Sequence, residues 1–158
     1  VILRPFNTFG PRQSSRAVIP TIVRQAITGD VVRLGSLHPT RDFLYVDDTV
    51  SGFIAAAKSD LTPGAELQIG TGVETSIGDI VRMTGQILGH PLQVQSEEQR
   101  VRPGTSEVER LVCDYSEAKR LTGWAPQVSF PEGLRRVIEW MNNRNRADTT
   151  THVHEYVI

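Results

Sequence analysis

The sequence has 158 residues, enough for one domain with a substantial core. Its 17 basic and 18 acidic residues give a net charge of -1. This argues against nucleic acid as the main partner, since binding a phosphate backbone needs a basic excess. No apolar run approaches the roughly 20 residues that span a bilayer, so no membrane partner is expected. A single cysteine, Cys113, excludes a disulfide within the chain and a cysteine-built metal site, and is typical of a cytoplasmic protein.

Short strands and amphipathic helices alternate along the chain, which predicts an α/β fold. The segment Val1–Leu3 is typical of a buried strand cut from its context, and residues 5–16 are predicted to form a loop. Helices are predicted at about 17–28, 48–58, 77–88, 116–123 and 131–143, and short strands at 31–34, 43–46, 67–70 and 92–95. Apolar periodicity is lost from Asn142 onward, so residues 144–158 are expected to form a tail that is loose or docked on a partner.

Polar side chains at the predicted helix starts are typical of caps. Ser76 and Asp79 have the spacing of a capping box, Ser116 precedes the short fourth helix, and Asp47 precedes the second. Asp47 and Asp48 also form a carboxylate pair, but their place before a helix favours capping over acid/base catalysis.

The first candidate binding segment, RPFNTFGPR at residues 4–12, directly follows the first predicted strand. Ligands of open α/β sheets bind outside the carboxyl ends of strands, and an asparagine there both donates and accepts hydrogen bonds. Asn7 is therefore a candidate ligand-binding residue. The alternative is a turn in which Asn7 bonds only to its own local backbone.

Two further segments carry candidate cations. In PTRDFLYVDD, residues 39–48, an arginine entering a strand fits a diphosphate, which its planar fork grips with two hydrogen bonds. The alternative is a surface ion pair of Arg41 with Asp42 or Asp47. In RVRPGTSEVER, residues 100–110, a polar loop with cations can close over an anionic ligand, or can simply be solvated. The four histidines share no metal-ligand spacing, so no metal site is predicted.

Taken in this order, the three segments resemble the C-terminal half of the extended short-chain dehydrogenase/reductase family. This family comprises NAD-dependent nucleotide-sugar epimerases, dehydratases and decarboxylases. SEAKRLTGWAP and SFPEGLRRVIEW are similar to its closing helices, so the resemblance runs from Val1 to about Asn142. Within the family, RQSSRAVIPTI, LGSLHPTRDF and RPGTSEVERLVCD most resemble the nucleotide-N-acetylglucosamine 4,6-dehydratases of legionaminic acid biosynthesis.

The resemblance implies the C-terminal substrate-binding portion of an extended Rossmann-type enzyme over residues 1–143. Residues 1–4 would be a late strand of a Rossmann sheet whose other strands lie in a missing N-terminal half. Contacts to a nucleotide-diphosphate sugar are implied at Asn7, Arg16, Arg41, Arg102 and Glu107. Glu107 is included among these contacts as a substitute for the aspartate that many relatives carry where this chain has Thr105. Pro5 and Phe6 are implied to lie near the nicotinamide of NAD.

The family's phosphate-binding glycines and its Tyr-x-x-x-Lys pair precede the matched region, so no catalytic residue is assigned to this chain. The resemblance therefore implies a substrate-binding half that is inactive alone, binds no cofactor by itself and forms a homo-oligomer in the parent enzyme. The alternative is a standalone nucleotide-sugar-binding or interaction module without catalysis. A non-functional remnant, which would bind no nucleotide, is a third interpretation.

Overall fold

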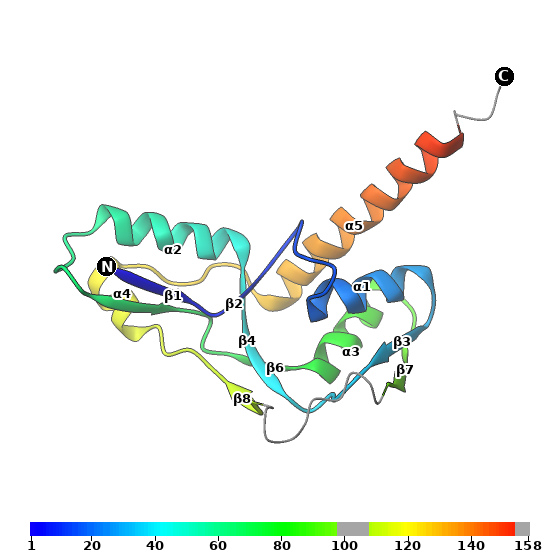
Figure 1. Ribbon diagram of the computed structural model, residues 1–158, viewed down its shortest axis with the longest axis horizontal. Coiled ribbons are helices and arrows are strands. Elements are labelled where there is room, and N and C mark those ends of the chain that lie inside the picture. Colours follow the sequence, from blue (N-terminus) through cyan, green and yellow to red (C-terminus); the bar gives the residue numbers. More distant parts are fainter. Residues whose placement is uncertain (98–107, 154–158) are drawn as a thin grey trace.

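The computed structural model describes residues 1–97 and 108–153. The helices are α1 (Val18–Thr28), α2 (Val46–Lys58), α3 (Ile77–Leu88), α4 (Ser116–Thr122) and α5 (Phe130–Val153). The strands are β1 (Ile2–Pro5), β2 (Asn7–Phe9), β3 (Val31–Leu34), β4 (Thr40–Tyr45), β5 (Glu66–Ile69), β6 (Glu74–Ser76), β7 (Gln93–Ser96) and β8 (Arg110–Leu111). Figure 1 shows two groups of elements joined through β4, with α2, α4, β1 and β5 at one end and α1, α3, β3 and β7 at the other.

The strands form three small sheets. β1 pairs with β5, and β3 pairs with β7, both in parallel. In the third sheet, the central strand β4 lies parallel to β2 and β8 and antiparallel to β6. Parallel strands connected through helices confirm the predicted α/β fold.

Two hydrophobic cores lie on opposite faces of β4, because successive side chains of a strand point to opposite sides. Phe43 and Tyr45 belong to a first core, in which Phe9 contacts both rings edge-on at centroid distances of 6.3 and 5.5 Å. Leu44 belongs to a second core formed with Leu67, Ile69, Ala118 and Trp124. The alternation also places Arg41 on the face of the first core and Asp42 on the face of the second.

The capping predictions have mixed outcomes. The Ser76 hydroxyl accepts the backbone N–H of Asp79 at 3.0 Å, which confirms that cap. Asp47 does not cap α2, because the helix already begins at Val46, directly after β4, and no side chain caps it. Ser116 does not cap α4, because it is the first helical residue, and Asp114 accepts its backbone N–H at 3.0 Å instead.

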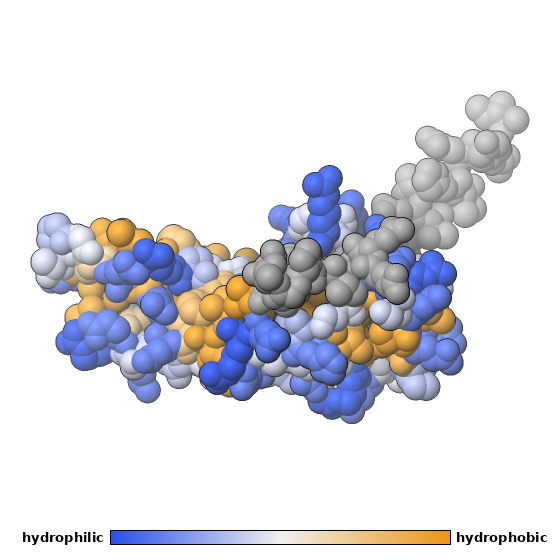
Figure 2. Space-filling model, turned by 60° about the horizontal axis from the view of Figure 1, so that its bottom comes forward, coloured by the Kyte–Doolittle hydropathy of each residue, from blue (hydrophilic) through white to orange (hydrophobic). Residues whose placement is uncertain are grey.

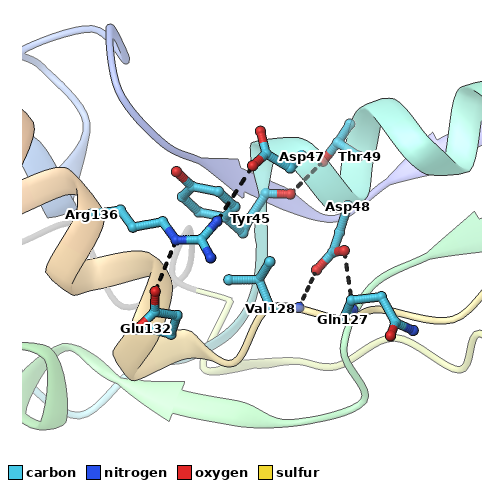
Figure 3. A network of polar contacts seen from close by, with 8 residues as sticks. All are labelled: Tyr45, Asp47, Asp48, Thr49, Gln127, Val128, Glu132 and Arg136. Atoms are coloured by element: carbon cyan, nitrogen blue, oxygen red, sulfur yellow. Dashed lines mark hydrogen bonds and ion pairs between the residues drawn. The ribbon is translucent and has the colours of Figure 1, made fainter.

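Asp48 connects α2 to the segment that leads into α5. Its carboxylate is buried and accepts the backbone N–H groups of Gln127 and Val128 at 3.0 and 2.9 Å (Figure 3). Close by, Arg136 of α5 lies over the ring of Tyr45 and within 3.5 Å of the Asp47 carboxylate. Neither aspartate therefore has the capping role predicted for it. Both instead hold distant segments together at the start of α2.

Three short strands were not predicted, and the last helix is longer than predicted. β2 lies inside the predicted loop 5–16, while β6 and β8 have only three and two residues. Such strands form through pairing with β4 and lack a local alternation long enough to reveal them. α5 continues to Val153, whereas a tail that is loose or docked on a partner was predicted from residue 144. Figure 1 shows the last turns of α5 projecting from the body.

Replacing Asp48 with alanine should lower the free energy of unfolding by about 2–4 kcal/mol, because two backbone N–H groups lose their hydrogen bonds to a buried carboxylate. Asp47→Ala is the matched control and should have a far smaller effect, since the Asp47 side chain is 66% exposed. Urea denaturation followed by circular dichroism measures both. Equal stabilities of the two variants would show that the Asp48 contacts do not hold this segment.

Candidate functional site

A cavity of about 510 Å³ collects side chains from four separate segments of the chain. They come from the start of β2, the head of α1 with the loop before it, the end of β3 with the turn that leads to β4, and β4 itself, and the first residue of α3 adds to them. The residues that line it are Asn7, Gln13, Arg16, Ala17, Val18, Thr21, Leu34, Gly35, Ser36, Pro39, Arg41, Phe43 and Ile77. A volume of this size is typical of a small-molecule site.

The polar part of the cavity is built on the parallel pair of β2 and β4, in which Asn7 lies opposite Phe43. Asn7 donates from Nδ2 to the backbone carbonyl of Asp42 at 2.9 Å, which fixes its amide at the start of β2. Arg41 is half-buried and donates to the backbone carbonyl of Thr40 at 2.8 Å. The fixed amide and guanidinium can therefore bind an anionic, hydrogen-bonding ligand.

The opposite part of the cavity is apolar. Leu34 and Phe43 are only 4% and 6% exposed, and Val18 and Ile77 belong to the same core. Buried core side chains at the wall of a cavity provide a rigid, dry surface for a ring or another flat group. The cavity thus combines cations with an apolar wall, as required by a ligand that carries both an anionic group and a ring.

Three of the five predicted substrate-binding residues, Asn7, Arg16 and Arg41, line this one cavity. Arg102 and Glu107 lie outside the described residues, and their roles stay predictions. Pro5 ends β1 and Phe6 follows it, with the Phe6 N–H donating to Ile69 at 2.9 Å. Neither of these two lines the cavity.

Two specific alternatives, a local backbone bond of Asn7 and an ion pair of Arg41 with Asp42 or Asp47, are not found among the described residues. Asn7 bonds to the carbonyl of Asp42, 35 residues away, and not to its own local backbone. The Asp42 carboxylate bonds on the other face of β4, and Asp47 pairs with Arg136, so neither expected ion pair of Arg41 forms.

Gln13 is a site residue that the sequence did not single out. Its Nε2 donates to the backbone carbonyl of Thr8 at 2.9 Å, which fixes the side-chain amide. Its Oε1 is buried and has no hydrogen-bond partner among the described residues. A buried acceptor without a partner is costly, so this oxygen is a candidate acceptor for a ligand hydroxyl. The only signal in the sequence was the place of Gln13 in a polar loop.

Asp42 organises the backbone behind the cavity. Its fully buried carboxylate accepts the backbone N–H groups of Thr71, Gly72 and Cys113 and the hydroxyl of Thr71, at 2.7–3.1 Å. Desolvation by burial, together with the negative charges of Asp42 and Asp114, raises the pKa of the Cys113 thiol to about 12. Cys113 is therefore a neutral core side chain and not a nucleophile.

In the described part of the chain, no helix is long and apolar enough to cross a membrane. Among the same residues, no three His, Cys, Asp or Glu side chains are grouped as ligands of a metal ion.

Comparison with protein families gives a match to GDP-mannose 4,6 dehydratase over residues 1–137. The chain therefore belongs to this family of NAD-dependent extended short-chain dehydrogenases/reductases. The match confirms the resemblance predicted from the sequence. The narrower likeness to N-acetylglucosamine 4,6-dehydratases stays a prediction.

Several relatives in this family carry out different reactions. A putative UDP-glucose 4-epimerase of Methanocaldococcus jannaschii is 32% identical over 92% of this chain and 46% of its own length. UDP-glucuronic acid decarboxylase 1 of Xenopus tropicalis is 33% identical over 88% of this chain and 32% of its own. The UDP-glucuronic acid 4-epimerase of Bacillus cereus, solved with UDP-glucuronic acid and NAD, has a TM-score of 0.82 and 29% identity over 91% of this chain and 45% of its own. The chain thus spans half or less of the length of these relatives.

Cys113 should resist alkylation in the folded chain at pH 8 and react with iodoacetamide only after unfolding, because its side chain is buried and its thiol stays protonated. The folded pKa of about 12 lies above the usual 9.0, so the thiol favours the folded state below pH 9. This contribution is lost as the pH rises from about 9 toward 12. Mass spectrometry of labelled protein across a urea series measures the reaction. Rapid labelling without urea would contradict the burial.

Proposed function

We propose that this chain supplies the nucleotide-sugar-binding part of an NAD-dependent epimerase or dehydratase. The observation that carries the proposal is the single cavity in which Asn7, Arg16 and Arg41 meet an apolar wall. Support comes from the family, since the Bacillus cereus relative is solved with a UDP-sugar and NAD. The diphosphate of the ligand lies against the arginines, and its nucleoside lies along the wall.

Three features favour a diphosphate over other anions. The guanidinium of Arg41 is positioned by β4 and matches the geometry of a phosphate group. Arg16 lies just before α1, where an exposed side chain can reach a second phosphate oxygen. Ala17 and Val18, at the start of α1, also line the cavity, and no side chain caps this helix. Its unpaired N–H groups and positive dipole end therefore face the ligand.

The apolar wall and Gln13 fit the remaining parts of a nucleotide sugar. Leu34 and Phe43 provide the flat contact that a base or sugar ring needs. The unpaired Oε1 of Gln13 accepts a hydroxyl of the sugar or the ribose. The nucleotide, the sugar and the choice between epimerisation and dehydration depend on groups beyond these residues.

The rest of the enzyme is proposed to cover β1 and α2. Within the described residues β1 pairs only with β5, which leaves its other edge without a strand. On α2, Val50, Phe53 and Ile54 share one face and are 52%, 51% and 49% exposed. Figure 2 shows hydrophobic surface at the end of the molecule that carries these elements. An N-terminal dinucleotide-binding half would pair with that edge and bury this face, and Pro5 and Phe6 at the end of β1 would then lie near its nicotinamide.

A standalone nucleotide-sugar-binding module is the second candidate. It shares the cavity but needs no partner for β1 and α2. The exposed strand edge and the apolar face of α2 favour the enzyme half, because water penalises such surfaces unless another segment covers them.

In the enzyme that contains this chain, Arg41→Ala should raise the dissociation constant of the nucleotide sugar about 10- to 100-fold, because one charge-assisted contact to the diphosphate is lost. NAD affinity should stay unchanged. Isothermal titration calorimetry measures both. Arg82→Ala is the matched control, since Arg82 is exposed on α3 and does not line this cavity. Normal sugar binding with weakened NAD binding in Arg41→Ala would contradict the assignment.

The isolated chain should convert no nucleotide sugar in the presence of NAD, because the family's glycine-rich loop is not in its sequence. The Tyr-x-x-x-Lys spacing of Tyr115 and Lys119 lies at the start of α4 and does not line the cavity. Adding the N-terminal half of a family member should restore turnover, and Phe53→Asp on the α2 face should prevent this rescue without unfolding the chain. A coupled spectroscopic assay for the 4-keto product, with circular dichroism on each variant, tests both statements. Turnover by the isolated chain would refute the first. Unimpaired rescue of Phe53→Asp would refute the proposed docking face.

A further inference from the structure

A second cavity, of about 530 Å³, lies against the loop of residues 10–15, α1 and α5. The residues that matter for its chemistry are Arg12, Gln13, Arg24, Trp140, Met141 and Arg144. None of the described residues that line it is acidic. Gln13 also lines the first cavity, so the two cavities have this lining residue in common.

Several other surface arginines of the chain are neutralised by nearby carboxylates. Arg82, Arg120 and Arg135 each pair with a carboxylate three residues away. By contrast, the guanidinium groups of Arg12 and Arg24 have no hydrogen bond or ion pair in the part of the chain that the structure describes. The cavity therefore concentrates positive charge that described carboxylates do not neutralise.

The third arginine is held by an aromatic ring. The guanidinium of Arg144 lies 5.6 Å from the ring centroid of Trp140, a distance at which a cation is attracted to the ring face. This contact holds the guanidinium at the cavity. Trp140 is half-buried and reports on the cavity, whereas Trp124 belongs to the second core.

Arg12 occupies a backbone conformation that favours glycine. Its φ is +68°, and it is the only non-glycine residue with positive φ among the described residues. It follows Pro11 in a turn closed by the N–H of Gln13 and the carbonyl of Gly10 at 3.3 Å. Glycine is preferred at the third position of such a turn. An arginine at a strained backbone position indicates that its side chain has a function.

We propose that this cavity is a second anion site, which binds the phosphate or diphosphate group of a small molecule. Three guanidinium groups at one cavity favour a multiply charged oxyanion over a singly charged carboxylate. The site does not depend on the function proposed for the first cavity, since Arg16 and Arg41 do not line it. The free anion and a phosphorylated metabolite share this chemistry, and competition between pyrophosphate and a nucleoside diphosphate distinguishes them.

The test is a fluorescence titration of the full 158-residue chain with pyrophosphate. The wild-type chain should give a saturable change that Trp140→Phe removes. Arg24→Gln and Arg12→Gly should each weaken binding about tenfold or more. Arg12→Gly supplies the residue that the turn prefers, so its circular dichroism and stability should be at least those of the wild type. Arg82→Gln, the matched control, should bind normally.

Arg41→Gln separates the two cavities. If the second site exists, this variant keeps the Trp140 signal and its midpoint even when it no longer binds a nucleotide sugar. The absence of a saturable signal in the wild-type chain would overturn the proposal. So would a signal lost in Arg41→Gln but retained in Arg24→Gln, or acetate binding as tightly as pyrophosphate.

Discussion

The carboxylate of Asp42 lies in the interior of the chain, and its partners among the described residues are all uncharged hydrogen-bond donors. The three backbone N–H groups and one hydroxyl that it accepts come from the turn after β5 and from the segment that enters α4. A buried charge is tolerated only when such donors surround it. These bonds therefore fix the position of β4 relative to two other parts of the chain. The backbone carbonyl of the same residue holds Asn7.

The alternation of side chains along β4 places the cavity on the face opposite the buried Asp42 carboxylate. Asp42 and Leu44 face the second core, so Arg41 and Phe43 necessarily face the other way, toward the cavity. The close backbone around Asp42 leaves no room for larger residues. A side chain at Gly70 would come within 2.4 Å of Cys113 and 2.9 Å of the Asp42 carboxylate. The glycine is required there because the carboxylate and its donors need the space.

Features that depend on local sequence patterns were predicted well from the sequence. Features that depend on tertiary contacts were not. α1 and α3 lie where apolar periodicity placed them, within one residue at each end. The grouping of Asn7, Arg16 and Arg41 followed from the family resemblance, since nothing in their separation along the chain brings them together. Asp48 was misread because its acceptor role depends on Gln127 and Val128, some 80 residues away. Gln13 was missed because an unpaired buried oxygen is a property of the folded chain alone.

The junction of β4 and α2 links the binding cavity to the surface proposed for the rest of the enzyme. β4 ends at Tyr45 and α2 begins at Val46, so no loop separates Arg41 from the apolar face of α2. The contacts of Asp48, and of Arg136 with Tyr45 and Asp47, hold this junction against α5 (Figure 3). A rigid strand-to-helix connection sets the distance and angle between the cavity and any domain docked on α2. In an enzyme whose chemical groups lie in the other half, that geometry is what a binding half must supply, because reacting atoms have to meet within a few tenths of an ångström.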